Sequence, residues 1–352
     1  MNKRTFAIVI ALLTFFVGVA LARLSGLLTF HRPARPQPKV ELSNYSLSGP
    51  FQHENLTIYL LHAADQPKTN TRFTPLEDAM KRKVVTVYET NDVNELWIEN
   101  HSQDEEVFVQ AGDIVKGGQQ DRALAIDLII PARSGRIPIA VFCVEPGRWR
   151  QRGVESADHF TLTEMMVSTR ALKLATKDAA PQQQVWDEVA AARRNLTTAL
   201  PANQNAASAE SSLQLAQENK QVQAATAPYI NKLSSIVDGQ TTAVGFAFFI
   251  NNKFNSAEVY ASNAMFKRFW PKLLKTTAIE AVGLLLADDR NEKLSDTDIA
   301  NSLNDADRGV ESYRYVSPRT HVIKRQGEKT FLFETRDMNQ NGAWLHRSYL
   351  AK

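Results

Sequence analysis

The chain has 352 residues, of which 43% are hydrophobic and 22% charged, which is ordinary globular material able to bury a core. At this length we expect two folded units, because domains commonly run about 100–200 residues. The net charge of +3 is unevenly spread, since the first 40 residues hold six of the 41 basic residues and none of the 38 acidic ones. The remainder is therefore mildly acidic and has no electrostatic reason to bind nucleic acid. A single cysteine excludes an internal disulfide, a CxxC redox pair and a cysteine-rich zinc cage.

The first 30 residues are predicted to be a targeting segment rather than part of the fold. Lys3 and Arg4 precede an uncharged apolar run at residues 6–22, and the run ends in Ala20-Leu21-Ala22, which is typical of a signal-peptidase site. Apolar residues continue to Phe30, so a retained membrane anchor is the alternative. We therefore expect residues 1–30 to be a signal peptide or a membrane anchor.

The charge around this segment gives a conflicting indication. Four basic residues follow it and two precede it, which argues against export by the positive-inside rule. The order of basic, apolar and small residues nevertheless favours export, and we expect the protein on the periplasmic side of a cell envelope, secreted or anchored. Residues 31–40 contain three prolines and are predicted to be an extended linker.

Residues 41–155 consist of short apolar runs between turn residues. No long helical pattern separates the runs, so we expect an antiparallel β-sandwich or a barrel-like domain rather than a parallel sheet. Strands are predicted at Leu56 to His62, Lys83 to Glu89, Glu95 to Asn100, Ala123 to Ile130 and Ile137 to Val144.

Residues 156–352 change periodicity and are predicted to be a helical and mixed α+β region packed on the β-domain. The fold class expected for the whole chain is therefore α+β. Helices are predicted at Phe160 to Ala175, Gln182 to Leu200, 210–236 and Met265 to Leu286. Strands are predicted at Thr242 to Ile250, Ser256 to Tyr260, Tyr313 to Val316, Thr330 to Thr335 and Trp344 to Leu350.

The polar turn from Gly117 to Arg122 allows two interpretations. Its backbone N–H groups could surround an anion that Arg122 grips. Alternatively, the glycines accept positive φ in a plain turn between strands, and Asp121 and Arg122 satisfy each other. The turn lacks the lysine of a Walker loop and the third glycine of a dinucleotide fingerprint.

A second polar turn follows the strand predicted at Ile137 to Val144. Glu145 and Arg148 flank Pro146-Gly147 as a charge pair, and Trp149 either caps the core edge or stacks on a ligand. Both turns lie at strand ends, where loops commonly carry function. The tentative ligand-binding residues are Gln119, Asp121, Arg122, Glu145, Arg148 and Trp149. The tail sequence His346 to Tyr349 is a weaker addition.

Cys143 has apolar neighbours on both sides of its strand, so we expect a buried, structural thiol with a raised pKa. The seven histidines show no spacing that would pair one with this thiol. HExxH, GxSxG and EF-hand patterns are absent from the sequence, so we expect no metal site and no cofactor. Catalytic residues stay unassigned.

The strings AGDIVKGGQQDRALAIDLIIP and FCVEPGRW resemble a bacterial family of uncharacterised function, the ADP-ribosylglycohydrolase- and rhodanese-phosphatase-superfamily-associated domain. The resemblance continues through Phe160, Arg170 and Gln184-Val185-Trp186, and resumes at VGFAFFINNK and LLKTTAIEA. It covers most of residues 45–285. It implies a context of ADP-ribose and phosphate metabolism, and no established activity.

Three functions remain open from the sequence. The first is binding of a small polar or anionic ligand, or of an envelope protein, by an exported or membrane-anchored chain. The second is a hydrolase or transferase acting on a phosphorylated or ADP-ribosyl compound. The third is a structural scaffold without a ligand. A membrane contact through residues 6–30 is expected if the segment is not cleaved, and no nucleic-acid partner is expected.

Overall fold

A computed structural model describes residues 44–64, 73–200, 211–285 and 295–352. These residues belong to one compact unit. The predicted leader and linker at residues 1–40 lie outside the described residues. Among the residues that are described, no helix is long and apolar enough to cross a membrane.

The largest sheet has eight strands, all antiparallel, in the order β1-β2-β12-β13-β17-β16-β15-β14. β12 has the sequence AVGFAFFI and is buried along its whole length, because both faces of the sheet are covered at its centre. The strands are β1 (Ser46–His53), β2 (Leu56–His62), β12 (Ala243–Ile250), β13 (Lys253–Tyr260), β14 (Val310–Tyr315), β15 (Thr320–Gln326), β16 (Thr330–Asp337) and β17 (Ala343–Ala351).

A second sheet of six strands forms a nearly closed barrel in the order β11-β7-β8-β10-β5-β4. Its edge strands approach each other, since Tyr88 and His159 form a β-bridge and the Glu89 N–H donates to the Asp158 carbonyl at 3.0 Å. Apolar side chains such as Val87, Ile98 and Val141 form one buried cluster in this part. The strands are β4 (Val85–Tyr88), β5 (Glu95–Asn100), β7 (Asp113–Gly117), β8 (Arg122–Leu124), β10 (Arg136–Cys143) and β11 (Phe160–Met166).

A small sheet and several helices complete the unit. The small sheet has the order β3-β6-β9, formed by β3 (Phe73–Pro75), β6 (Glu106–Val109) and β9 (Leu128–Ile130). The helices are α2 (Leu76–Lys81), α3 (Arg170–Lys177), α4 (Gln182–Ala199), α5 (Leu213–Gln217), α6 (Lys220–Leu233), α7 (Asn263–Gly283) and α8 (Asp296–Asp307), with 3-10 turns at Ser234–Val237 and Met338–Gln340.

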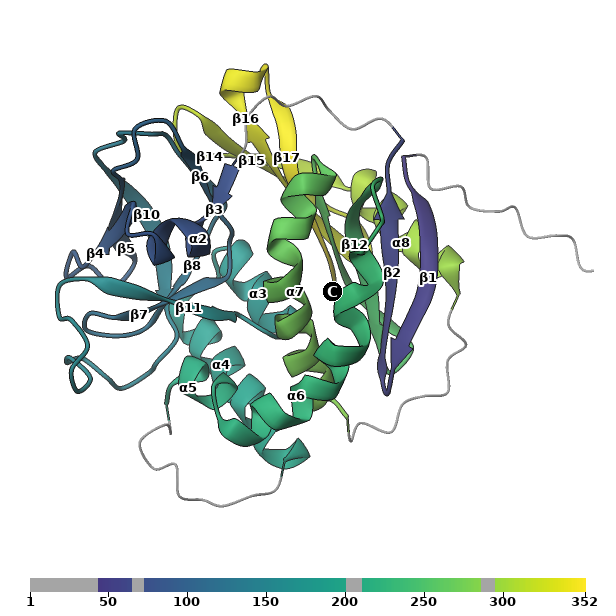
Figure 1. The fold of residues 1–352 in the computed structure, drawn as a ribbon, viewed down its shortest axis with the longest axis horizontal. Helices are drawn as coiled ribbons and strands as arrows, with labels where there is room; N and C mark the ends of the chain where they lie inside the picture. Colours follow the sequence, from purple (N-terminus) through teal and green to yellow (C-terminus); the bar gives the residue numbers. More distant parts are fainter. Residues whose placement is uncertain (1–43, 65–72, 201–210, 286–294) are drawn as a thin grey trace, which may run out of the picture. The chain divides into compact units, whose positions relative to one another are not determined.

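Helices fill the space between the barrel and the eight-stranded sheet (Figure 1), with α7 at the centre in contact with β11 on one side and β12 and β13 on the other. Ser262 caps α7 by accepting the Met265 N–H, and the helix continues through Pro271. α8 covers the opposite face of the large sheet, where Ile299 and Leu303 join a separate apolar cluster. The barrel and the large sheet are therefore held through a shared helical layer.

The structure is mostly β, with a barrel-like sheet and several helices, in line with the barrel-like alternative predicted from the sequence. The expected order, a β-domain followed by a helical region, is not confirmed. β1 and β2 come from the start of the described chain, yet β2 pairs with β12 in the large sheet. Pairing between strands so far apart leaves no local sequence signal.

Two element predictions were wrong. The helix expected over Phe160 to Ala175 is strand β11 followed by α3, which begins after Thr169 accepts the Leu172 N–H as its cap. The single strand expected over Ala123 to Ile130 is two strands, β8 and β9, in two different sheets. The chain turns between them at Ala125 to Asp127, and Asp127 becomes a buried ionic residue.

Gly245 provides a test of the centre of the large sheet. An added Cβ would lie 2.2 Å from the Glu258 carbonyl oxygen on β13, so Gly245→Ala must displace a central strand. We expect a loss of about 1–3 kcal/mol in the free energy of unfolding, measured by urea denaturation. The control is Gly283→Ala at the end of α7, where the nearest atom is 3.5 Å away and alanine is the better helix former. Equal losses for the two variants would contradict this account.

Candidate functional site

Three of the six tentative site residues, Asp121, Glu145 and Arg148, meet in a buried ionic network at one end of β8 and β10. Asp121 is fully buried and accepts hydrogen bonds from Arg148 at 3.2 Å, from Arg152 at 3.0 and 3.1 Å and from Ser212 at 3.2 Å. Glu145 pairs with Arg148, as the sequence predicted, and also with Arg152 at 3.2 Å. Arg152 was missed because it lies in a loop without periodicity.

Arg122 lies apart from that network, and the expectation that Asp121 and Arg122 satisfy each other was wrong. The Arg122 side chain is 1% exposed, lies 3.8 Å from Glu89 and donates to the Gln120 carbonyl at 3.0 Å. Adjacent residues in a strand point to opposite faces, so Asp121 and Arg122 reach different partners.

The glycine turn before these residues already holds the protein's own carboxylates. Gly117 and Gly118 have φ of 127° and 53°, in agreement with the plain-turn interpretation. The Gly117 N–H donates to Asp121 at 3.3 Å, and the Gln119 N–H donates to Glu89 at 3.0 Å. The N–H groups that could bind an external anion therefore already donate to the protein's own carboxylates.

Trp149 comes directly after Arg148 in the loop that follows β10, and it is 52% exposed. None of the six tentative residues lines the cavity described below. Cys143 is buried as expected, and burial raises the pKa of its thiol. Asp121 and Glu145 are paired with Arg148 and Arg152 of the loop after β10.

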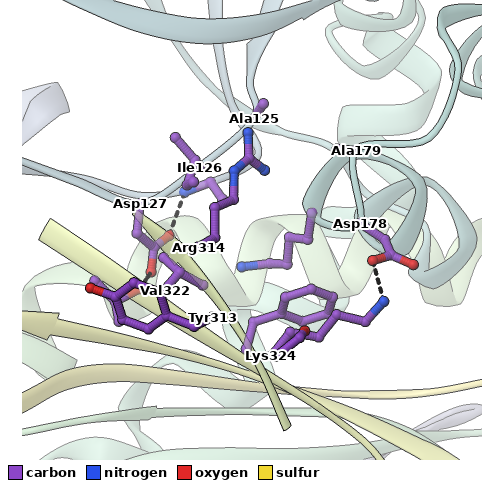
Figure 2. Close-up of a pocket in the computed structure, with 14 residues that line it drawn as sticks. Ala125, Ile126, Asp127, Asp178, Ala179, Tyr313, Arg314, Val322 and Lys324 are labelled. Atoms are coloured by element: carbon purple, nitrogen blue, oxygen red, sulfur yellow. Dashed lines mark hydrogen bonds and ion pairs between the residues drawn. The ribbon is translucent and has the colours of Figure 1, made fainter. Parts of the chain in front are cut away.

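A different cavity, of about 280 Å³, lies where the barrel, the end of α3 and strands β14 to β16 meet. Three cationic side chains line it, Lys177 from α3, Arg314 from β14 and Lys324 from β15, and we call it the cationic cavity. Figure 2 shows Lys324 reaching toward Asp178 at one end and Asp127 with Arg314 at the other. Sites between structural parts are common places for ligands.

The cations of this cavity differ in how they are neutralised. Lys324 forms an ion pair with Asp178. Lys177 and Arg314 form neither a hydrogen bond nor an ion pair within the described part of the chain. The Lys177 ammonium lies 6.0 Å from the Phe333 ring centre. The cavity therefore holds two cationic groups without a carboxylate partner in contact.

Asp127, on the wall of this cavity, belongs to a fully buried chain of charged residues. One carboxylate oxygen accepts the Ala111 N–H at 2.7 Å, and the other accepts Thr335 at 2.6 Å and His346 Nδ1 at 2.7 Å. His346 Nε2 lies 2.8 Å from Glu258. Asp127, His346 and Glu258, here called the buried triad, link the segment before β9 to β17 and β13.

The pKa shifts of the buried triad agree with one another. Burial by itself would raise the pKa of Asp127 and of Glu258, but the charge and hydrogen bonds of His346, together with the charge of Lys177, hold both below their ordinary values. Burial would lower the pKa of His346, but Asp127 and Glu258 raise it. In its protonated form the imidazole donates from both nitrogens, each to a carboxylate oxygen. It has no lone pair left to act as a general base.

Sequence reasoning missed Asp127 and gave His346 little weight. A signal existed, since Asp127 is the lone charge inside the apolar run Ala123 to Ile130, and a buried carboxylate needs a partner. The partner is 219 residues away, so spacing could not identify it.

The pH dependence of stability provides a test of the buried triad. A raised folded-state pKa means that His346 stabilises the fold fully below its ordinary value of 6.5, and that this contribution is lost as pH rises through the folded value. His346→Gln should cost about 3–5 kcal/mol at pH 6, because it leaves two buried carboxylates without a cation. The difference from wild type should shrink at alkaline pH.

The measurement is urea denaturation from pH 6 to pH 10. The control is His101→Gln, because His101 is 43% exposed and its removal should matter little at any pH. A cost for His346→Gln that stays constant over this range would show that His346 is neutral in the folded protein.

The fold and this cavity define a mostly β protein with a charged cavity at the junction of its parts. Residues 44–350 match the model of the ARG and Rhodanese-Phosphatase-superfamily-associated Protein domain, ARPP-1. Since the match spans nearly all described residues, the chain belongs to this family, as the resemblance indicated. No curated protein and no solved structure matched the chain.

Proposed function

We propose that this protein binds a small anionic ligand in the cationic cavity. The observation that carries the proposal is the pair Lys177 and Arg314, which face one cavity without a carboxylate in contact. Lys177 is half-buried and Arg314 is exposed, and an anion bound between these like charges reduces their mutual repulsion. Arg314 can grip a phosphate or carboxylate through two parallel hydrogen bonds, and Lys177 adds a point charge.

The size of the cavity and the family favour a phosphorylated compound. The volume of about 280 Å³ lies near the lower limit for pockets that enclose small molecules, about 300 Å³. The family description names an association with ARG and with the rhodanese-phosphatase superfamily. Both associations fit a ligand that carries phosphate, such as a sugar phosphate or part of ADP-ribose.

The expected affinity is modest. Three charge-assisted hydrogen bonds supply about 1.5–3 kcal/mol each. Association itself costs at least about 4 kcal/mol. At most about 5 kcal/mol remains, which corresponds to a Kd of about 0.2 mM or weaker, so titrations must reach millimolar ligand concentrations.

A hydrolase or transferase acting on the same ligand class is the second candidate. Asp127 favours it, because this ionised carboxylate lines the cationic cavity. The hydrogen bonds of His346 argue against it, because an imidazole that donates from both nitrogens cannot accept a proton. The scaffold interpretation draws its support from the network around Asp121, in which the carboxylate is fully paired. An envelope protein as partner stays an alternative to a small ligand.

Charge-removing variants test ligand binding directly. Lys177→Gln and Arg314→Gln should each weaken binding of inorganic phosphate, ribose 5-phosphate or ADP-ribose by about tenfold, a loss of about 1.4 kcal/mol. Their melting temperatures without ligand should stay unchanged, because neither side chain is paired. The measurement is isothermal titration calorimetry.

Lys220→Gln is the matched control, since Lys220 is exposed at the start of α6. Binding that persists in the double variant Lys177→Gln, Arg314→Gln would place the ligand elsewhere. If none of the anions binds, the result would favour the interpretation of the protein as a structural scaffold without a ligand. Turnover of a bound compound would favour the second candidate, a hydrolase or transferase.

The location of the protein is a separate proposal, supported by the basic and then apolar order of residues 1–30. Fusing residues 1–40 to a reporter that is active only outside the cytoplasm should give activity. Activity of a cytoplasm-specific reporter on the same segment would contradict export. A shift in size consistent with cleavage after Ala22 would distinguish a signal peptide from an anchor.

A further inference from the structure

The two edges of the eight-stranded sheet differ in how they are protected against pairing with a further strand. β1, at one edge, contains Pro50 and has a β-bulge between Ser48 and Phe51. Prolines and bulges are devices by which proteins keep an edge from pairing. β14, at the other edge, has the sequence VESYRY without proline or glycine, and its ladder with β15 runs without a bulge. β14 is therefore the less protected edge.

β14 is open to solvent along its whole length. All six of its residues are exposed, and Val310, Tyr313 and Tyr315 are 81%, 59% and 60% exposed. In the described part of the chain β14 pairs only with β15, so its other long side carries no strand. An exposed edge strand with apolar side chains is a template for pairing with another chain.

Alternate residues of β14 direct their backbone groups toward this open side. The Val316 N–H donates to the Thr320 carbonyl at 3.2 Å, in the register of the ladder between β14 and β15. Hydrogen-bonded pairs alternate with non-bonded pairs along an antiparallel ladder, so the even-numbered residues of β14 bond to β15. The outward N–H and C=O groups are therefore those of Glu311, Tyr313 and Tyr315. None of the described residues forms a hydrogen bond with these outward groups.

We propose that β14 pairs with β14 of a second copy of this chain, antiparallel, with Tyr313 opposite Tyr313 of the other copy. Glu311 of each copy then lies opposite Tyr315 of the other. Every outward-facing residue thus meets another outward-facing residue, and each pair exchanges two backbone hydrogen bonds. The two eight-stranded sheets become one continuous sheet across a two-fold axis.

The side chains of β14 favour this register over its neighbours. The Tyr315 hydroxyl can donate to the Glu311 carboxylate across the interface, and Ser312 lies opposite Arg314, so no like charges are directly opposite. A shift of the second copy by two residues in one direction places Arg314 opposite Arg314. A shift by two residues in the other direction carries Tyr315 past the end of the partner strand. A shift by four in that direction places Glu311 opposite Glu311.

Sedimentation equilibrium of the full chain, in a density-matched mild detergent that keeps residues 1–30 in solution, tests the pairing. Wild type should form a dimer between micromolar and millimolar chain concentration. Tyr313→Pro removes an outward N–H and none of the bonds to β15, and proline is tolerated at such a position of an edge strand. The variant should keep its fold and dimerise about tenfold more weakly or worse, because both hydrogen bonds of the central pair are lost.

Tyr315→Glu and Tyr315→Lys form a matched pair at one exposed position. The first places a like charge opposite Glu311, and the second places an opposite charge there. The glutamate variant should dimerise about fivefold more weakly than the lysine variant, or worse. Both variants share residues 1–40 with wild type, so any association through that segment would be the same in all of them.

A thiol at the two-fold axis tests the register. Copies of Tyr313→Cys lie about 5.5 Å apart between Cα atoms, and a short thiol-to-thiol cross-linker should join them. Tyr315→Cys is the matched control, because its copies are four residues out of register, about 14 Å apart, and should cross-link about tenfold more slowly. Wild type should not cross-link, since Cys143 is buried.

The dimer does not depend on a ligand in the cationic cavity. Lys177→Gln, outside β14, should dimerise as wild type does, so this proposal and that of the anion site can fail separately. A monomer at millimolar concentration, with β14 free or covered by residues 1–40 or by a different protein, would overturn the proposal. Dimerisation that is unchanged in both Tyr313→Pro and Tyr315→Glu, or equal cross-linking at the two cysteines, would overturn it as well.

Discussion

The buried imidazolium of His346 is the interaction on which the assembly of this fold depends. It joins Asp127, which follows the barrel strand β8, to Glu258 in the centre of the large sheet. The cost of burying these charges is large, and it is recovered only while all three stay in contact. The same contact fixes Asp127 on the wall of the cationic cavity, so the geometry of that cavity follows from how the two sheets are joined.

Ionic contacts of this kind recur wherever the parts of the unit meet. Arg319 donates to Glu106 of β6 at 2.8 Å and to Asp337 of β16 at 2.9 Å, and Lys272 of α7 donates to Asp113 of β7 at 2.6 Å. The interiors of the barrel and of the large sheet are apolar clusters. Apolar burial supplies most of the stability within each part, whereas the ion pairs require one specific fit between parts. The cationic cavity lies at such a junction, where polar groups are already present.

The sequence predicts what is local in this structure. β2 and β5 have the predicted bounds because apolar runs and turn residues delimit them. The split of Ala123 to Ile130 was missed because one residue, Asp127, leaves the sheet to meet a partner far along the chain. The Glu145–Arg148 pair was predictable from a three-residue spacing. The cationic cavity was not, since Lys177, Arg314 and Lys324 come from three elements that only the tertiary fold brings together. Periodicity likewise does not reveal the β-bulge at Asn255.

The pairing of β2 with β12 has a consequence for how the chain reaches its native state. His62 and Thr242 are hydrogen-bonded although 180 residues separate them. At a synthesis rate of about 5–20 residues per second, β2 waits roughly 10–40 seconds for its neighbour to be made. Its sequence, LTIYLLH, is almost wholly buried in the finished sheet. During that interval it is an exposed apolar segment that is prone to aggregation. Folding should therefore be slow and sensitive to chain concentration, and a chaperone that covers β2 would protect the nascent protein from aggregation.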